Sequence, residues 1–409
     1  MKILTVHNKY LNRGGEDESR ESEDRLLAAN GHEIRHVLFE NTTIRSRSLF
    51  RVGLECSWSK PAYDRVHEAI EEWRPDILDV HNFFPLASPS IWYAGRNLRV
   101  PVVQTLHNYR LLCPAATFLR DGRVCEDCTH HALPFPGIVH RCYHGSMLQT
   151  AAVALMIGMH RALKSADRAV SLFIVVSEFE KAKFLENGIP ESRLFVKPNF
   201  VLDGGGPGQG GEDFLFVGRL SEEKGIDVLL RAMECAGELP RLNIVGDGPL
   251  RPEVEQAARR NPRIRYLGTR SQAEVLELMG SSRCVIVTST WYETFGRVVA
   301  ESFSRGTPVI VSNIGALAEL VDHHRTGLLF TLGDAQDLAT AMKYATANPK
   351  LLDQMRKNAR LEFAEKFTAA RNLKMLLAAY EIAKRNQEAD SGLSGSVFLK
   401  YKVAGSGNG

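Results

Sequence analysis

Short apolar runs alternate with longer stretches of helical period along most of the chain. The runs are rich in Val and Ile, and the stretches between them repeat apolar residues every three or four positions. This alternation is typical of parallel α/β structure, in which a helix follows each strand and returns the chain to the same edge of the sheet. In the first half the pattern predicts strands at residues 2–6, 33–39, 76–80, 101–106, 171–176 and 194–197.

A second series of strands follows a glycine-rich segment at residues 203–211, DGGGPGQGG. Its side chains are too small to pack, which predicts a linker. Gly206, Gly208 and Gly211 match the G-x-G-x-x-G fingerprint of dinucleotide sites, but a strand follows where the fingerprint requires a helix, so we reject it. The later strands are predicted at residues 214–217, 242–245, 264–267, 284–288 and 308–311.

The two series predict two Rossmann-like, doubly wound domains. A chain of 409 residues is also too long for one ordinary core. We expect an N-terminal domain at 1–202, the linker at 203–211 and a C-terminal domain at 212–365. After these we expect a helix at 366–388 that crosses back to the N-terminal domain, and a mobile Gly/Ser-rich tail at 389–409.

Composition narrows the class of protein. With 44% hydrophobic and 24% charged residues the chain is typical of a soluble globular protein. Its net charge of +3 gives no support for a nucleic-acid partner. The first residues lack the apolar run of a secretory signal, and we find no stretch long enough to span a bilayer, so we expect a cytoplasmic protein.

The loop after the first strand of the second series carries two cations. Arg219 and Lys224 lie in VGRLSEEKG, between that strand and a helix. Ligands of open α/β sheets bind beyond the carboxyl ends of the strands, where a helix N-terminus adds partial positive charge. The pair therefore favours a phosphate site over a solvated basic loop.

Two glutamates eight positions apart follow a later strand. Glu293 lies in the loop WYETFGR, and Glu301 falls inside the next helix among apolar residues, where a carboxylate normally has a partner. This spacing lets both face one crevice at different depths. Glu301 suits the vicinal hydroxyls of a ribose, and Glu293 suits the hydroxyls of a sugar.

The N-terminal half offers polar groups at the matching edge of its own sheet. Three strands end in the dipeptide His-Asn, at His7, His81 and His107. Because the carboxyl ends of parallel strands share one edge, we expect these groups to line a crevice. Gly14 and Gly15 open the first helix, where the missing Cβ atoms would let backbone amides approach a phosphate.

Together these motifs resemble the GT-B glycosyltransferases of the large retaining, glycogen-synthase-like family, of the family 4 type. The resemblance is carried by the Gly14-Gly15 turn, TLHN at 105–108, the R-x4-K loop, and the E-x7-E pair with the Gly-Thr-Pro that follows it. It implies two Rossmann-like domains that face a central cleft. It also implies transfer of a sugar, with retention, from a nucleoside diphosphate sugar to a glycan, lipid-linked or small-molecule acceptor in polysaccharide or glycoconjugate biosynthesis.

The resemblance implies roles for single residues on the phosphate side. Arg219 and Lys224 match the cations that bind the donor diphosphate. Because they would stabilise the charge of the leaving group, we count both among the catalytic residues. Gly15, with Gly14 before it, matches the glycine near the β-phosphate.

On the sugar and ribose side, His107 matches the histidine beside the transferred sugar and Glu293 the acid that touches it. Glu301 matches the ribose-binding acid. The backbone amides near Phe295 and Gly296 match the rest of the phosphate cradle. Bulky residues flank Glu293 where the family usually has smaller ones.

A mechanism without a catalytic metal or other cofactor follows from charge balance. Negative charge develops on the leaving diphosphate and must be stabilised by cations or a metal. The sequence contains no Asp-x-Asp pair, so we expect Arg219 and Lys224 to supply that charge. We find no second carboxylate placed as a nucleophile. We therefore favour the same-face attack proposed for this family, in which a donor phosphate oxygen accepts the acceptor proton.

Four cysteines follow His107 closely, at Cys113, Cys125, Cys128 and Cys142. A Cys-x2-Cys knuckle with histidines nearby could hold a structural Zn²⁺, and the alternative is four reduced cysteines in a long loop. Under both alternatives we expect the segment to shape the acceptor pocket, because it follows His107.

A segment between residues 45 and 60 mixes basic and aromatic side chains without clear period. Such a mixture can rest on anionic lipid, bind a charged acceptor, or form a solvated loop. Peripheral contact with the inner face of a membrane therefore stays an alternative. The residues are Arg45, Arg47, Leu49, Phe50, Arg51, Trp58 and Lys60.

Two other functions were weighed against glycosyl transfer. A nucleotide-sugar 2-epimerase would use two similar domains without an acceptor, but the R-x4-K loop and the E-x7-E pair argue against it. A non-catalytic nucleotide-sugar-binding module would bind the donor without turnover.

Overall fold

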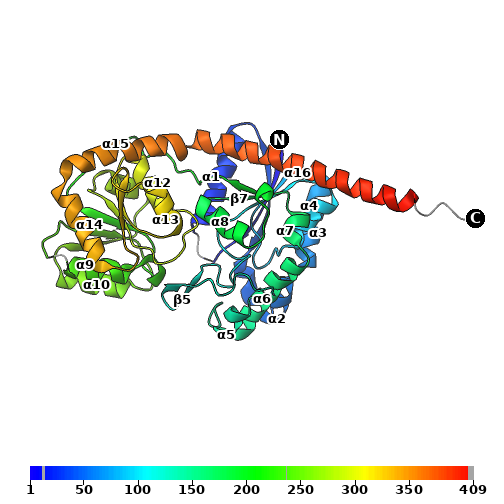
Figure 1. The fold of residues 1–409 in the computed structure, drawn as a ribbon, viewed down its shortest axis with the longest axis horizontal. Coiled ribbons are helices and arrows are strands. Elements are labelled where there is room, and N and C mark those ends of the chain that lie inside the picture. Colours follow the sequence, from blue (N-terminus) through cyan, green and yellow to red (C-terminus); the bar gives the residue numbers. More distant parts are fainter. Residues whose placement is uncertain (12–13, 236, 404–409) are drawn as a thin grey trace, which may run out of the picture.

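The computed structural model describes residues 1–11, 14–235 and 237–403 of the chain. Two α/β domains lie side by side along the long axis of the molecule (Figure 1). Each domain contains a six-stranded sheet, and every strand pairing within these two sheets is parallel. The predicted fold class, two Rossmann-like, doubly wound domains, is confirmed.

The N-terminal sheet has the strand order β2-β1-β3-β4-β7-β8. Its strands are β1 (Lys2–Lys9), β2 (Glu33–Glu40), β3 (Ile77–Asn82), β4 (Val102–Thr105), β7 (Leu172–Val175) and β8 (Leu194–Val196). The helices and 3-10 turns of this domain are α1 (Gly15–Ala29), η1 (Asn41–Ser46), α2 (Leu49–Glu55), α3 (Lys60–Trp73), α4 (Ser90–Asn97), α5 (Phe135–Val139), α6 (Met147–Ala162), α7 (Ser165–Ala169), α8 (Glu178–Glu186) and η2 (Glu191–Arg193).

The C-terminal sheet has the order β11-β10-β9-β12-β13-β14. Its strands are β9 (Phe214–Val217), β10 (Leu242–Val245), β11 (Ile264–Gly268), β12 (Val285–Val287), β13 (Val309–Ser312) and β14 (Gly327–Phe330). The other elements are η3 (Glu222–Lys224), α9 (Ile226–Cys235), α10 (Arg251–Arg260), α11 (Gln272–Gly280), α12 (Arg297–Ser304), α13 (Gly315–Leu320), α14 (Ala335–Ala347), α15 (Pro349–Lys366) and α16 (Ala369–Val403).

Every strand predicted from the sequence is present, although β1 continues beyond its expected end to Lys9. Strand β14 was missed because its short apolar run begins with a glycine and resembles the end of a loop. The two-residue strands β5 (Leu119–Arg120) and β6 (Arg123–Val124) form a small antiparallel hairpin that is too short for a sequence period to reveal.

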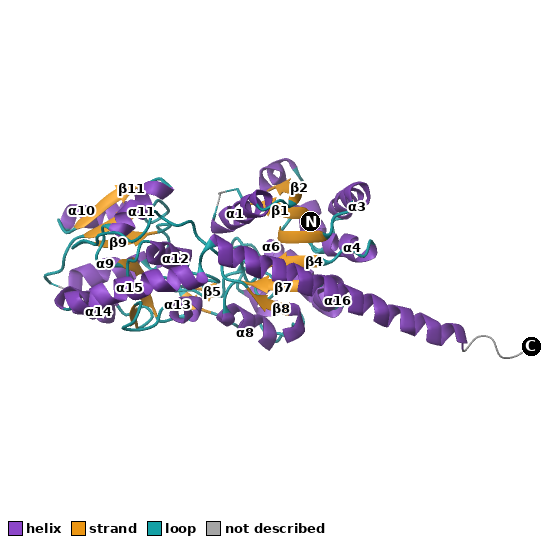
Figure 2. Ribbon diagram, turned by 90° about the horizontal axis from the view of Figure 1, so that it is seen from above, coloured by secondary structure: helices purple, strands orange, loops and turns teal. Residues whose placement is uncertain are grey.

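Helices cover both faces of each sheet, so each domain has three layers (Figure 2). In the C-terminal domain one face packs on α9 and α14, and the other packs on α12 and α15. In the N-terminal domain one face packs on α3, α4 and α6. The other face is covered by α1 and by α16, which belongs to the far end of the chain.

The glycine-rich segment 203–211 has no regular secondary structure, as predicted for a linker, but its backbone packs against the C-terminal domain. A Cβ atom at Gly208 would collide with the backbone of Gly280, and one at Gly211 would collide with the Ser281 carbonyl oxygen. Two of its glycines are therefore required by close approach of the backbone and not by flexibility alone.

Helix α16 crosses back to the N-terminal domain, where Leu376, Ala379, Tyr380 and Ala383 are buried. The Tyr380 hydroxyl donates a hydrogen bond to Oδ2 of the buried Asp79 on β3, at 2.7 Å. The helix continues to Val403, whereas the sequence predicted a mobile tail from residue 389. The glycines that suggested the tail lower helix propensity but do not end the helix. The rest of the predicted tail, 404–409, lies outside the described residues.

Replacing Tyr380 by Phe should lower the free energy of unfolding of the N-terminal domain by about 1–3 kcal/mol, because the buried Asp79 carboxylate loses its hydroxyl donor. Chemical unfolding of the variant measures this loss. Tyr344→Phe, at an exposed tyrosine of α14, is the control and should stay within about 0.5 kcal/mol of the parent. Equal losses in the two variants would contradict a specific role of the hydrogen bond to Asp79.

Candidate active site

The strand order of the C-terminal sheet reverses between β9 and β12, which pair with each other. Ligands of doubly wound sheets bind beyond the carboxyl ends of the strands at such a point. Arg219 and Lys224 lie in the loop after β9, and Glu293 lies in the loop after β12. Three residues selected from the sequence therefore lie at the switch point.

The geometry of the two loops brings Lys224 to Glu293. Gly225 has a φ of 67°, and a Cβ atom there would collide with the carbonyl oxygen of Thr288 at the end of β12. The Thr288 hydroxyl also donates to the Lys224 carbonyl at 2.7 Å. With the loops held together, Lys224 Nζ lies 2.7 Å from Glu293 Oε1, and the Ser289 hydroxyl donates to the same carboxylate oxygen.

Arg219 differs from Lys224 in its surroundings. Arg219 is exposed, and within the described part of the chain its side chain makes no hydrogen bond or ion pair. Lys224 is mostly covered and also lies over the Trp291 ring, 5.6 Å from its centroid. The site thus holds one cation that is neutralised by Glu293 and one that is free to meet an anion.

Glu301 is buried in α12, as its apolar neighbours predicted, and it has partners. Its Oε1 accepts hydrogen bonds from Arg297 Nε and Gln272 Nε2, each at 2.9 Å. Burial raises the pKa of this carboxyl, and the Arg297 guanidinium opposes the shift. Both bonds use Oε1, which leaves Oε2 without a partner among the described residues and able to accept from a hydroxyl.

The turn before α12 presents backbone donors. Phe295 is buried, and Gly296 is the N-cap residue of the helix. Within the described residues neither amide donates a hydrogen bond, as expected for the first turn of a helix. These two amides and the positive end of the α12 dipole are suited to an anion, and the phosphate contact predicted for them stays a prediction.

The carboxyl edges of the two domains meet at this site. The Thr294 hydroxyl donates to the His107 carbonyl at 3.1 Å, and the Tyr292 hydroxyl donates to Glu126 Oε1 at 2.9 Å. Arg297 Nη2 lies 3.3 Å from Glu18 Oε2 in the first turn of α1. The N-termini of α1 and α12 therefore face each other across the domain junction (Figure 1, Figure 2).

Gly14 and Gly15 lie at the α1 side of this junction. Gly14 is the N-cap residue, Gly15 begins the helix, and a Cβ atom at either would meet no atom of the described residues within 4 Å. The Gly14 amide donates to Asp17 Oδ2 at 3.0 Å. Among the described residues no side chain blocks the approach to either glycine, and the phosphate contact predicted for them stays a prediction.

The three His-Asn pairs do lie at one edge, but they do not all face a ligand. His7 is fully buried and bonds Asp17 Oδ1 at 2.8 Å, which is a structural role. His81 Nδ1 lies 3.2 Å from His107 Nε2. Burial opposes protonation of His81, yet Asp79 outweighs it and raises its pKa, whereas burial and the His81 charge lower the pKa of His107 well below its usual value. His107 is therefore neutral at pH 7.

Sequence reasoning gave no role to Glu16, which directly follows Gly15. Burial raises the pKa of its carboxyl to about 8, and its Oε1 is buried with no partner among the described residues. Asn108 Nδ2 lies 3.5 Å from its Oε2. A neutral Glu16 does not repel an anion at the α1 N-terminus. In the sequence it looked like one of several acids that favour the start of a helix.

Arg297 and Gln272 were also missed as partners of Glu301. Arg297 stood in the quoted motif directly after Gly296, but a helical arginine is usually solvated. Gln272 opens α11, which is distant in sequence, so its contact with Glu301 left no local signal.

The segment with the four cysteines reaches the C-terminal domain. Val124 of its hairpin packs against the core that contains Phe295, and Glu126 accepts the Tyr292 hydrogen bond. The thiols of Cys113, Cys125, Cys128 and Cys142 are free, and burial with the neighbouring thiols raises the pKa of Cys128 to about 12. Over the described residues, no three His, Cys, Asp or Glu side chains are placed to hold a metal ion, so the structure gives no support to the zinc alternative for these cysteines.

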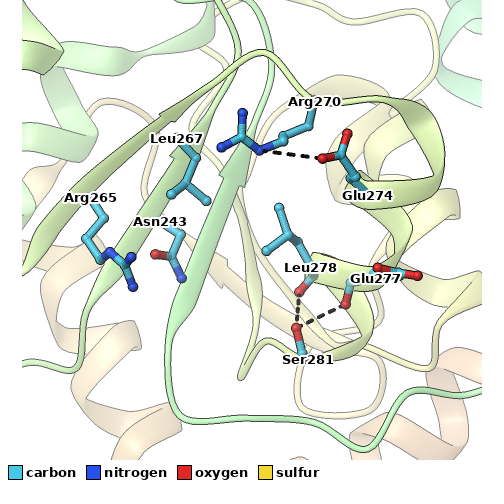
Figure 3. Close-up of a pocket in the computed structure, with 8 residues that line it drawn as sticks. All are labelled: Asn243, Arg265, Leu267, Arg270, Glu274, Glu277, Leu278 and Ser281. Atoms are coloured by element: carbon cyan, nitrogen blue, oxygen red, sulfur yellow. Dashed lines mark hydrogen bonds and ion pairs between the residues drawn. The ribbon is translucent and has the colours of Figure 1, made fainter.

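A cavity of about 600 Å³ lies elsewhere, between β10, β11 and α11 (Figure 3). Asn243, Arg265 and Leu267 line it from the strands, Arg270 lines it from the loop before α11, and Glu274 lines it from the first turn of that helix. None of the residues predicted for the site lines it. The candidate site is therefore the domain junction and not this cavity.

Two family models match the chain, one on each domain. Residues 19–202 match the model described as Glycosyltransferase Family 4, and residues 205–362 match the model described as Glycosyl transferases group 1. The boundary between the matches falls in the predicted linker.

Individual relatives agree with these models. The chain is 26% identical to a glycogen synthase of Mycobacterium tuberculosis, over 85% of this chain and 76% of that protein. It is 25% identical to a sulfoquinovosyl transferase of Arabidopsis thaliana, over 79% of this chain and 60% of the relative.

Solved structures of the same fold cover nearly the whole chain. The Anabaena protein HepE in complex with UDP superposes with a TM-score of 0.68 at 19% identity, over 93% of this chain and 100% of that chain. Sucrose-phosphate synthase from Thermosynechococcus elongatus gives 0.66 at 17% identity, over 93% and 98%. With both domains matched and the motif residues gathered at their junction, the chain belongs to the GT-B glycosyltransferases that comprise family 4 and group 1.

Proposed function

We propose that the protein transfers a sugar, with retention of anomeric configuration, from a nucleoside diphosphate sugar to a glycan, lipid-linked or small-molecule acceptor. The role would lie in polysaccharide or glycoconjugate biosynthesis, at the cytoplasmic side. HepE has been solved with UDP and glucose, so uridine diphosphate sugars are the first donors to test.

One observation carries the proposal: Lys224 and Glu293 pair at the switch point of the C-terminal sheet, and Thr294, which directly follows Glu293, donates a hydrogen bond to the His107 carbonyl of the other domain. A donor that lies along this junction would place its diphosphate by Lys224, Arg219 and the two facing helix N-termini. Its ribose would lie by Oε2 of Glu301, and its sugar would lie between Glu293 and the end of β4.

Charge balance explains how this arrangement could drive transfer. In the free protein Glu293 neutralises Lys224, which lowers the cost of holding a partly buried cation. When the sugar–phosphate bond breaks, the charge that grows on the diphosphate would attract Lys224 and Arg219 more strongly. Cations held in place before the reaction stabilise the transition state more than the ground state.

The proton of the acceptor hydroxyl needs a base on the same face of the sugar as the leaving group. In the proposed mechanism a donor phosphate oxygen accepts this proton as the new glycosidic bond forms and the old one breaks. His107, neutral at pH 7, would hydrogen-bond the sugar and would not compete for the phosphate as a cation. The two cations would take the place of a catalytic metal.

Replacing Arg219 or Lys224 by Ala should lower turnover at least about a hundredfold, as expected when one group that stabilises transition-state charge is removed. Arg260→Ala, at an exposed arginine of α10, is the matched control and should leave turnover unchanged. Steady-state rates with a UDP-sugar donor give the comparison. Near-parental turnover in both variants would refute the assignment of these cations.

Glu301→Ala should weaken the binding of free UDP at least about tenfold, because a buried acceptor for the ribose hydroxyls is lost. Glu293→Ala should keep UDP affinity within about threefold, since it releases Lys224 for the diphosphate, and should instead damage transfer. Titration calorimetry with UDP separates the two variants. Equal losses of affinity would argue against the proposed division of roles.

Transfer should proceed with retention and without a catalytic divalent metal. Adding EDTA should leave the initial rate unchanged, and NMR of the product should show the anomeric configuration of the donor. Zinc analysis of the same protein decides separately between the two alternatives for the four cysteines, because loss of a structural zinc would be slow and would lower the stability of the protein. An inverted product, or activity lost at once and restored by Mg²⁺, would overturn the mechanism.

A further inference from the structure

Helix α6 has an apolar face that no other described element covers. Its sequence, MLQTAAVALMIGMHRA, contains no Asp, Glu, Lys or Arg before Arg161. A helix that is hydrophobic all round is normally buried all round. Here Leu148, Leu155 and Ala162, which recur every seven positions and so share one face, are exposed, with Leu148 at 84%.

Two other segments flank this face of α6. On one side α2 packs against it, with Gly53 next to Ala152. On the other side the segment before α5 packs against Gly158 through Leu133. Figure 1 shows α2, α5 and α6 together at the lower edge of the N-terminal domain, away from α16.

The flanking segments expose large hydrophobic side chains as well. Phe50 in α2 is 77% exposed, and Phe135 in α5 is 60% exposed. Exposed apolar patches of this kind on a soluble domain mark a surface of interaction. We refer to this surface as the α2–α5–α6 face, and define it by Phe50, Leu54, Phe135, Val139, Leu148 and Leu155.

Positive charge predominates around the α2–α5–α6 face. Residues 128–166 contain no Asp or Glu. In this stretch Arg141 and Lys164 are exposed, and neither forms an ion pair with another described residue. Arg47, just before α2, and Arg51 of α2 share a single acid, Glu55, which leaves an excess of positive charge. The Arg45 side chain, also named in the sequence analysis, lies outside the described residues.

We propose that the α2–α5–α6 face docks on the surface of an anionic lipid bilayer. The exposed apolar side chains can insert among the lipid chains, and the basic residues beside them can bind the anionic headgroups. A second copy of the chain fits less well, because a symmetric contact would bring the same unpaired cations together. In the part of the chain that the structure describes, no helix meets the length and apolarity needed to cross a membrane.

This docking would present the active site to an acceptor held in the membrane. The chain runs from His107 through the cysteine segment directly into α5 and α6. Gly137 of α5 packs against Cys128 in that segment, so the face and the site are parts of one packed unit. The choice of a lipid-borne acceptor rests on the proposed function, whereas membrane docking itself can be measured without transfer.

Co-sedimentation with vesicles tests the docking. The protein should bind vesicles of equal parts phosphatidylcholine and phosphatidylglycerol and bind phosphatidylcholine alone at least about tenfold more weakly, with binding that falls as salt rises. The double variant Leu148→Ser with Leu155→Ser should lose binding to the anionic vesicles at least about tenfold. The double variant Arg141→Gln with Lys164→Gln should weaken binding to the anionic vesicles about tenfold or more, because each basic residue near the membrane surface raises the affinity about fivefold.

The matched control replaces two exposed leucines on other surfaces, Leu185 in α8 and Leu361 in α15, by Ser. This control should bind anionic vesicles as the parent does, and UDP affinity should be the same in all variants if they are folded. Vesicle binding unaffected by the change at Leu148 and Leu155, or no binding by the parent, would overturn the proposal. A dimer in solution that the same change dissociates would also overturn it, in favour of a second copy.

Discussion

The contact between the loop after β12 and the end of β4 is the constraint on which the site depends. All strands within each main sheet are parallel, so each domain presents the carboxyl ends of its strands on one edge, and the Thr294–His107 hydrogen bond joins the two edges. The Arg297–Glu18 ion pair joins them a second time and brings the N-termini of α1 and α12 together. Residues far apart in sequence become one site because these edges meet.

The site is balanced in charge before any ligand is bound. Lys224 is paired with Glu293, and Arg297 is shared between Glu301 and Glu18. Burial keeps Glu16 neutral around pH 7, so it adds no negative charge at the α1 N-terminus. An incoming diphosphate would therefore first meet the amides of Phe295 and Gly296 and the Arg219 side chain, which have no partner among the described residues. Lys224 could then exchange Glu293 for a phosphate oxygen without the cost of burying a new charge.

The sequence predicted most of this arrangement because its signals were local. The strand periods located both sheets, and the loops with Arg219, Lys224 and Glu293 follow strand ends that the pattern identified directly. Contacts between segments that are distant in sequence could not be predicted. Examples are the Gln272–Glu301 hydrogen bond and the hydrogen bond from Tyr292 to Glu126 in the segment with the four cysteines. The apolar face of α6 was also missed, because a run without charges predicts burial until the neighbouring elements are placed.

The central claim is that the diphosphate of the donor binds at the junction of the two domains. A crystal structure of the protein with bound UDP tests it most directly. We predict the β-phosphate between the N-termini of α1 and α12, with Lys224 turned from Glu293 to a phosphate oxygen and Oε2 of Glu301 within hydrogen-bonding distance of the ribose. A diphosphate bound in the cavity between β10, β11 and α11, with the Lys224–Glu293 pair intact, would contradict the account.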